Sequence, residues 1–296
     1  MVETAVGSTV PRRTLGRGLR DAREAKGILA KAAAEELDFS TQKLWRIESG
    51  QVPVTVSDVR SMCFLYELDA KATEAFIALS KETKSKGWWV PYGDTLPRWF
   101  EPYVGMEQSA SRIRTYEWTL VPGLVQTREY MSYLFRTPGP EVTDDDLEKR
   151  ISLRLQRQAL FTRAFPAPPT VEFMIGEAAV RVEPREAGVM RSQLWHLLKA
   201  TELPQVSVRV LPISAGPHEA SVAGAFSMLD FPTDNGERPE PPTVYSENLT
   251  GALYLDKPAE INQYEKAWRT LDAVALSDAD SMTLLSSLLK GWNDRE

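Results

Sequence analysis

The chain has little of the chemistry that stabilises secreted or metal-binding proteins. Its 296 residues include one cysteine, Cys63, and two histidines, His196 and His218. A lone cysteine excludes an intrachain disulfide and any site built from several thiolates. Two further histidines leave too few ligands for a four-coordinate structural zinc site. We therefore expect no metal and no other cofactor.

Long hydrophobic runs are also missing. A helix that crosses a bilayer needs about 20 consecutive apolar residues, and no segment approaches that length. Residues 1–14 lack the apolar centre of a signal peptide. The hydrophobic share of 43% and the charged share of 26% are ordinary for globular proteins. We expect a soluble, cytoplasmic protein without membrane contact.

Positive charge is scarce overall but is distributed unevenly. The net charge of −6 argues by itself against nucleic-acid binding. Residues 1–86, however, hold 14 Lys and Arg against 12 Asp and Glu, a net charge of +2, while the remainder holds 21 against 29, a net charge of −8. A basic front segment on an acidic body is compatible with a DNA-binding protein that keeps most of its mass away from phosphate.

The length favours two domains. Residues 14–85 have the pattern of short helices separated by turns, without alternating strand patterns. We place an all-α domain at residues 1–85, an aromatic-rich connector at 86–105 and a larger mixed α+β domain at 106–296. Because aromatic residues are unusual in flexible linkers, we expect the connector to dock on the second domain.

Two short helices are predicted near the centre of the first domain. They cover residues 29–37 and 40–48 and are joined by a turn of about three residues. Ser40 supplies a hydroxyl that caps the second helix, and Leu44 and Ile47 face inward. This spacing is typical of a helix-turn-helix, in which the second helix lies in the DNA major groove.

The outward face of the second helix carries side chains that can recognise bases. Gln bonds bidentately to adenine, Lys and Arg bond to guanine, and Thr contacts a thymine methyl or a phosphate. Basic residues upstream can neutralise phosphates or enter a minor groove. The predicted DNA-binding residues are Ser40, Thr41, Gln42, Lys43 and Arg46, with Lys31, Arg12, Arg13 and Arg17. The alternative to DNA binding is that this helix face is only exposed to solvent and binds nothing.

The second domain mixes helical and strand periodicity. We predict helices over residues 99–117, 125–136, 144–164, 187–202, 258–275 and 279–291. Predicted strands cover residues 171–176, 206–212, 224–231, 243–248 and 250–255.

An enzyme is not expected. The sequence has no nucleophile-elbow glycine pattern, no phosphate-binding glycine loop and no paired-histidine metal motif. His196 lies among leucines, a pattern that favours a packed or surface residue of a helix over a catalytic one. His218 lies in a Gly/Pro loop, where a functional group could be exposed.

Three arginines form a stripe on the predicted helix 144–164. Arg150, Arg154 and Arg157 recur at i, i+4 and i+7. One interpretation is a solvated face that pairs with local Asp and Glu residues. The other is a docking site for an acidic partner or an anionic ligand, with His218 as a further candidate.

The segments LGRGLRDAREAKG (residues 15–27) and STQKLWRIESG (residues 40–50) resemble the xenobiotic-response-element type of helix-turn-helix regulator, whose relatives include the phage repressors. The ending R-I-E-S-G is the most specific part. The resemblance implies a lambda-repressor-like domain of five helices and a structural ion pair between Arg23 and Glu48.

Several positions depart from that pattern. Leu29 and Ala30 replace the usual Thr-Gln start of the second helix, so Lys31 is expected to take over the phosphate contact. Asp38 replaces the turn glycine, which is tolerable because Asp adopts left-handed backbone angles more readily than most residues. Trp45 replaces a small residue, and it either packs against the fold, which we favour, or inserts near the DNA backbone.

The resemblance continues into the second domain. Its most distinctive marks are VPGLVQT (residues 121–127) and the RxxRQ pattern within KRISLRLQRQALF (residues 149–161). These are similar to the C-terminal domain of unknown function in actinobacterial regulators of the WhiJ type. The resemblance implies a transcriptional regulator, usually a repressor, that controls development or secondary metabolism and is modulated by a small companion protein encoded nearby.

We therefore expect a sequence-specific regulator that binds double-stranded DNA as a homodimer, in association with the nucleoid. Dimerisation is expected because a single module makes a small interface, whereas two half-sites give usable specificity. The alternatives are a protein-interaction adaptor whose degenerate helix-turn-helix no longer reads DNA, and a regulator of the toxin–antitoxin type. A small ligand could replace the companion protein as the modulator.

Overall fold

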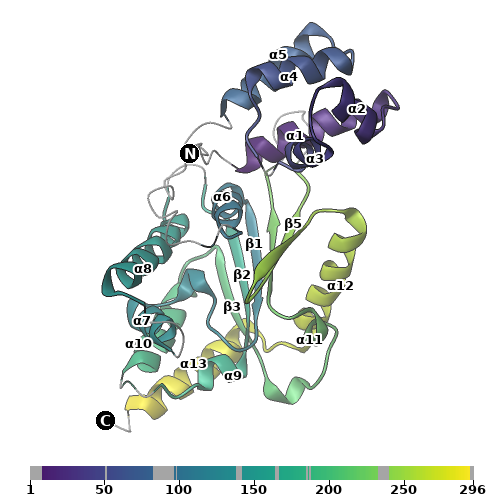
Figure 1. Ribbon diagram of the computed structural model, residues 1–296. Helices are drawn as coiled ribbons and strands as arrows, with labels where there is room; N and C mark the ends of the chain where they lie inside the picture. Colours follow the sequence, from purple (N-terminus) through teal and green to yellow (C-terminus); the bar gives the residue numbers. More distant parts are fainter. Residues whose placement is uncertain are drawn as a thin grey trace. The chain divides into compact units, whose positions relative to one another are not determined.

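The structure is a computed structural model, and it describes residues 9–50, 52–82, 97, 99–137, 142–163, 167–184, 186, 188–232 and 240–293. The chain divides into two compact units, Met1–Gly93 and Asp94–Glu296. Both are drawn in Figure 1, and each is described by itself below. Most of the predicted connector, residues 86–96 and 98, lies outside the described residues.

The described part of the first unit is entirely helical, as predicted. Two glycines with positive φ follow helices, Gly27 at 68° and Gly50 at 68°. Asp38 also has a positive φ, 54°, so the residue that replaces the turn glycine does adopt the left-handed conformation. The helices are α1 (Thr9–Ala25), α2 (Ala30–Glu36), α3 (Thr41–Glu48), α4 (Val56–Leu65) and α5 (Ala70–Glu82).

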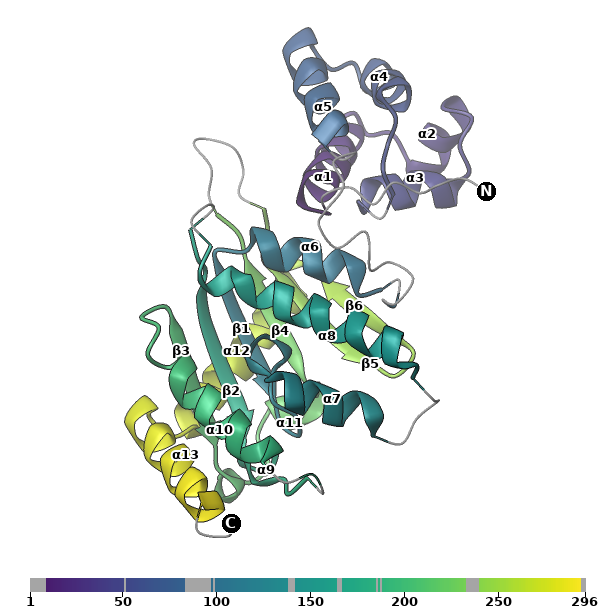
Figure 2. The same cartoon turned by 90° about the vertical axis from the view of Figure 1, so that its left-hand side faces the viewer.

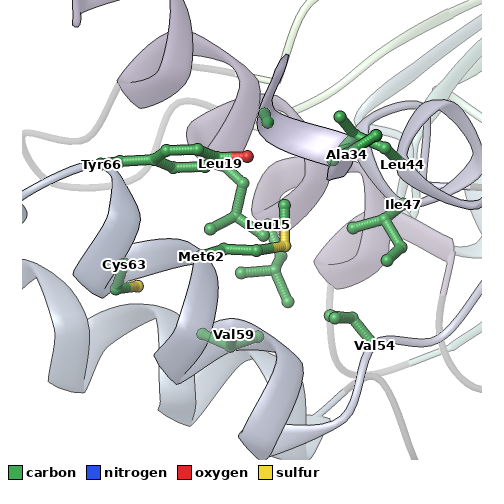
Figure 3. Packing of buried hydrophobic residues seen from close by; sticks show 11 residues of the cluster. Leu15, Leu19, Ala34, Leu44, Ile47, Val54, Val59, Met62, Cys63 and Tyr66 are labelled. Carbon is green, nitrogen blue, oxygen red and sulfur yellow. The ribbon is translucent and has the colours of Figure 1, made fainter. Parts of the chain in front are cut away.

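One hydrophobic core joins these helices. Figure 3 shows Leu15 and Leu19 of α1 directed toward Met62 of α4, with Leu44 and Ile47 of α3 beside them. All five side chains are at most 2% exposed. Each large aliphatic side chain buried in this way contributes about 1.5–3 kcal/mol, so the core fixes the orientation of α3 through its two inward residues.

A close approach of α1 to α3 in this unit needs a glycine. A Cβ atom built on Gly16 of α1 would lie 2.3 Å from the carbonyl oxygen of Ile47 and 2.9 Å from that of Glu48. Both neighbours are backbone atoms, which cannot move aside as a flexible side chain can. Gly16 therefore lets α1 pack directly on the C-terminal end of α3.

The second unit contains a mixed sheet with helices on both faces. Its strand order is β3-β2-β1-β4-β5-β6. The strands β1, β2 and β3 are parallel, whereas β4 pairs antiparallel with β1, β5 pairs antiparallel with β4, and β6 pairs antiparallel with β5. The strands are β1 (Arg112–Glu117), β2 (Thr170–Gly176), β3 (Val206–Leu211), β4 (Phe226–Asp230), β5 (Thr243–Asn248) and β6 (Gly251–Leu255).

The helices of this unit lie in two layers and along one edge. Helices α11 and α12 cover one face, while α6, α7, α8 and α10 lie on the other (Figures 1 and 2). Helix α13 flanks the edge strand β3, where the Ser281 hydroxyl accepts a bond of 2.9 Å from the backbone N–H of Val210. The helices are α6 (Glu101–Ser109), α7 (Arg128–Arg136), α8 (Asp144–Gln158), α9 (Glu177–Arg181), α10 (Val189–Ala200), α11 (Ala220–Ala223), α12 (Pro258–Val274) and α13 (Asp278–Asn293), with short 3₁₀ turns η2 (Gly123–Val125), η3 (Ala159–Phe161) and η4 (Ile213–Ala215).

The prediction of one helix over residues 99–117 is wrong. Helix α6 ends at Ser109, and residues 112–117 form β1, a central strand of the sheet. The strand was missed because Arg112 and Arg114 interrupt its apolar pattern. Arg114 is nevertheless buried, since its guanidinium donates bonds of 2.8 and 2.6 Å to Glu265 of α12. A tertiary ion pair thus permits an arginine inside a buried strand.

The other predicted elements of the second unit are present with shifted ends. The predicted helix 125–136 begins at Arg128, after the turn η2, because the Thr127 hydroxyl caps it by accepting the N–H of Tyr130. At the described end of the predicted connector, the Trp99 indole donates a bond of 3.1 Å to Glu247. No described helix is both long enough and apolar enough to span a membrane.

Substitution of Gly16 with alanine is expected to destabilise the first unit by about 1–3 kcal/mol, because the new methyl group overpacks the α1–α3 contact. Urea unfolding followed by circular dichroism measures the change. Gly291→Ala on α13 is the matched control, since no atom lies within 4 Å of its Cβ position. Equal stabilities of the two variants would contradict the close approach.

Candidate nucleic-acid interface

Helix α3 is held at both ends by local hydrogen bonds. The Ser40 hydroxyl caps its start by accepting a bond of 3.0 Å from the N–H of Lys43. At its end, the Ser49 hydroxyl donates a bond of 2.7 Å to the Trp45 carbonyl oxygen. A short helix with both ends satisfied keeps a defined set of outward side chains.

The predicted base-reading residues are all exposed. With about 3.6 residues per turn, Gln42 and Arg46 point away from the buried Leu44 and Ile47. Neither side chain forms a hydrogen bond or ion pair within the part of the chain that the structure describes. Both are therefore available for a ligand. Thr41, at the first position of α3, is exposed beside them.

Lys43 is exposed but already has partners. Its ammonium lies 3.5 Å from a carboxylate oxygen of Asp58 on α4 and 3.4 Å from the ring centroid of Phe39. An ion pair and a cation–π contact thus direct Lys43 along the protein surface. Lys43 must leave Asp58 before it can contact a base. The contact with Asp58 joins different elements, so no local sequence signal could have revealed it, whereas Phe39 lies only four residues before Lys43.

The expected packing of Trp45 is wrong. Its side chain is 57% exposed, and its place one turn after Thr41 puts it on the outward side of α3. Leu44 and Ile47 already fill the inward side. The indole therefore belongs to the surface that would face DNA.

The predicted phosphate-contacting residues lie around α3. Lys31 is exposed at the start of α2, while Arg12, Arg13 and Arg17 are partly exposed on α1, and each of these three has an interaction partner in the structure. Arg13 lies next to the end of α3, because a Cβ on Gly50 would be 2.7 Å from its Cα. The arginine thus borders the recognition helix.

A buried ion pair anchors α3 to α1. The Arg23 Nε and Nη2 atoms donate bonds of 2.6 and 2.9 Å to the two carboxylate oxygens of Glu48. The Nη1 atom donates a further bond of 2.8 Å to the Ile28 carbonyl oxygen. Each side chain of the pair is 8% exposed, and the bond to Glu48 raises the pKa of Arg23. Bidentate geometry fixes the orientation of the helix end as well as its position.

The arginine stripe of α8 is not a single surface. Arg157 is 4% exposed, and its Nε and Nη2 atoms donate bonds of 2.7 and 2.6 Å to Glu107 of α6. It cannot contact an external partner, because this part of α8 turns toward α6 and the sheet. Arg150 and Arg154 are partly exposed and lie near the Phe135 ring.

His218 lies apart from these arginines. Its ring is 6.1 Å from that of Tyr116, which belongs to the core cluster packed against α12. Its buried Nδ1 atom has no hydrogen-bond partner, and burial lowers its pKa. The four predicted docking residues therefore do not form one site.

Two adjoining hollows lie between α7 and α10, with volumes of about 470 and 420 Å³. They share Glu129 and Ser192, and His196 lines the first. Burial lowers the pKa of His196, while Glu129 acts in the opposite direction. Neither hollow includes His218. Within the described residues, no group of three His, Cys, Asp or Glu side chains could hold a metal ion.

We expect Glu48→Gln to destabilise the first unit by about 3 kcal/mol, because it removes the bidentate charged partner of the mostly buried Arg23 guanidinium and leaves only the longer contact of 3.5 Å to Glu24. Denaturant titration of the full chain measures the loss. Glu67→Gln, which breaks the exposed pair between Glu67 and Lys26, is the control and should change stability little. A similar loss in both variants would contradict the anchoring role of the buried pair.

Comparison with known proteins agrees with this architecture. The model of a family described as a helix-turn-helix domain matches residues 14–76, which include α2 and α3. A second model, described as a domain of unknown function (DUF5753), matches residues 100–287. No curated protein and no solved structure matches the chain. The helix-turn-helix domain indicates a DNA-binding regulator of transcription, and the chain as a whole belongs to the family defined by the DUF5753 domain.

Proposed function

We propose that the protein is a sequence-specific transcriptional regulator that inserts α3 into the major groove of double-stranded DNA. The observation that carries the proposal is the outward face of α3, where Gln42 and Arg46 are exposed and unpaired within the described residues. The buried pair between Arg23 and Glu48 holds that face in a fixed orientation. A preorganised helix loses little further freedom when it binds.

The roles of the side chains follow from their positions. Gln42 and Arg46 contact bases, and Lys43 joins them once its ammonium exchanges Asp58 for a base or a phosphate. The other predicted residues contact the phosphate backbone of the DNA and thereby set the position of α3 along the duplex. These phosphate contacts are assigned to Ser40, Thr41, Lys31, Arg12, Arg13 and Arg17.

The finer parts of the proposal rest on the sequence resemblance and on interface size. A single module buries only about 600–1,000 Å² on DNA, so a homodimer that reads two half-sites supplies the missing specificity. We infer a repressor that controls development or secondary metabolism on the nucleoid in the cytoplasm. The DUF5753 domain performs no catalysis and receives a small partner protein or a ligand.

A second candidate is a protein-interaction adaptor that does not read DNA. Two apolar side chains near the helix-turn-helix favour it, namely Leu29 with 76% exposure and Trp45 with 57%. Selection of random duplexes by the full-length protein separates the two functions. Enrichment of one sequence motif supports the regulator, whereas recovery of unenriched DNA supports the adaptor.

On the selected operator, Arg46→Ala and Gln42→Ala are each expected to weaken binding about tenfold and to relax the preference at one position, because a bidentate base contact contributes about 1–3 kcal/mol. Gel shifts over a panel of point-substituted operators measure both effects. Lys71→Ala on α5, an exposed charge away from α3, is the control. A uniform loss on operator and random DNA would contradict base reading.

Lys43→Ala is expected to weaken operator binding and to change base preference. Arg13→Ala is expected to weaken binding to all sequences and to reduce the slope of log binding constant against log salt concentration by about one. Binding measured at several salt concentrations separates a base contact from a phosphate contact. If Lys43→Ala lowers affinity equally for operator and random duplexes, the lysine is a phosphate contact instead.

Trp45 is expected to contact a thymine methyl group, the apolar feature of the major groove. Replacing thymines of the operator by uracil, which removes only the methyl group, should weaken binding by the wild-type protein at one position. The Trp45→Ala variant should bind the thymine and uracil duplexes equally. A methyl effect that persists in this variant would assign the contact to another residue.

A further inference from the structure

The segment between β1 and α7, residues 118–127, is held by side chains from two helices, α8 and α10. Gln193 of α10 accepts a bond of 2.8 Å from the Thr127 N–H and donates one of 2.7 Å to the Val125 carbonyl oxygen. Gln158 of α8 donates a bond of 2.7 Å to the backbone oxygen of Gln126. This rigid segment therefore holds the Gln126 side chain in place.

Gln126 faces an arginine whose other donors are unused. The buried amide of Gln126 donates a bond of 2.6 Å to the Val121 carbonyl oxygen, and its Oε1 atom accepts a bond from Arg154. Because this acceptor is neutral, the Arg154 guanidinium has no ion-pair partner there, although the charges of Glu247 and Glu117 act on it from beyond ion-pair distance. Its remaining N–H groups have no partner in the described part of the chain.

A second arginine, Arg150, lies four residues earlier on α8 and contacts the same aromatic ring. The Arg150 and Arg154 guanidinium carbons are 5.7 and 4.6 Å from the same Phe135 ring centroid. The Nε atom of Arg150 is buried and has no hydrogen-bond partner. No described carboxylate lies within ion-pair distance of either arginine.

The carboxylates of α8 do not compensate these two charges. Asp144 pairs with Arg136, Asp145 with Lys149, and Glu148 with Arg128. The solvated, locally paired face that the sequence suggested is therefore not formed at Arg150 and Arg154. Two arginines on one helix face that are partly shielded from water and have no ion-pair partner among the described residues are less stable than paired ones.

A carboxyl group lies within electrostatic range of Arg154. Glu117 ends β1, is partly exposed and forms no hydrogen bond or ion pair among the described residues. Burial raises its pKa to about 7, although Arg154 acts in the opposite direction. Burial likewise lowers the pKa of Arg154 to about 10. The cluster thus holds unpaired donors and a carboxyl group that is near its point of titration at neutral pH.

We propose that Arg150, Arg154, Gln126 and Glu117 form a binding site for a small-molecule oxyanion, whose carboxylate or phosphate-type group accepts hydrogen bonds from both guanidinium groups. The planar fork of arginine matches both kinds of anion. Such a ligand supplies the ion-pair partner that both arginines lack among the described residues. The inference rests on the part of the proposed function in which the DUF5753 domain receives a ligand, and it names the chemistry of that ligand.

The site also implies a dependence on pH. The charged and titratable groups that interact with Glu117 and Arg154 are Glu247 from β5, Tyr130 from α7 and Arg157 from α8. Ionised Glu117 repels an anion, whereas protonated Glu117 can donate a hydrogen bond to it. Binding therefore takes up a proton at Glu117 and weakens as the pH rises through neutrality.

Calorimetric titration of the full chain with sulfate and, separately, with acetate tests the site without DNA. Both probes keep a constant charge between pH 6 and pH 8, so a change in affinity reports on the protein. Preference for sulfate indicates a phosphate-type ligand, and preference for acetate a carboxylate. No DNA is present in this titration. A failure to bind the anion would therefore contradict this proposal without bearing on DNA binding.

Arg154→Gln is expected to lower the affinity for the preferred probe about tenfold, the effect of losing a charge-assisted hydrogen bond. Arg150→Gln is a second test variant and should also lower the affinity for the preferred probe. It carries little risk to folding, because this side chain forms no hydrogen bond in the described structure. Arg269→Gln, an exposed arginine on α12, is the matched control and should bind like the wild type. Glu117→Gln should abolish the difference between pH 6 and pH 8.

Two results would overturn the proposal. One is the absence of anion binding by the wild-type protein at either pH. The other is binding that Arg150→Gln and Arg154→Gln leave as strong as in the Arg269→Gln control, which would place the anion elsewhere, for example on the basic face of the first unit.

Discussion

The bidentate bond between Arg23 and Glu48 fixes the helix on which the DNA-binding role depends. Helix α3 has only eight residues, too few to be stable by itself. Its position depends on three contacts with α1, namely the buried ion pair, the packing of Leu44 and Ile47, and the close approach at Gly16. All three lie on the inward side, which leaves Gln42 and Arg46 on the outward side without side-chain hydrogen bonds or ion pairs among the described residues.

The same division of roles occurs along α8 in the second unit. Arg157 is buried and neutralised by Glu107, so it joins α6 to α8 and cannot serve a ligand. Arg154, less than one turn earlier, has a neutral partner and keeps unused donors. Two arginines on one helix thus differ in role because one faces a carboxylate and the other faces an amide held by the segment after β1.

The comparison of prediction and structure shows where local patterns suffice. The first unit was predictable because its helices are short, capped and periodic, and because Gly27, Asp38 and Gly50 lie where the chain needs left-handed angles. Strand β1 was missed because its arginines resemble a polar helix face until Glu265 is placed opposite Arg114. The exposure of Trp45 was missed because the choice between packing and exposure depends on whether Leu44 and Ile47 already fill the interior.

By itself, the sequence determined the all-helical first domain, the positions of α2 and α3, the outward set of polar residues and most strands of the second domain. These features depend on neighbours within a few residues, where capping, periodicity and turn chemistry act. Only the tertiary structure decided that Lys43 pairs with Asp58, that Arg157 is buried, and that Glu117, Gln126 and Arg154 meet. Those outcomes depend on which distant side chain lies opposite, because a charge is stabilised or left unpaired by its neighbours in space.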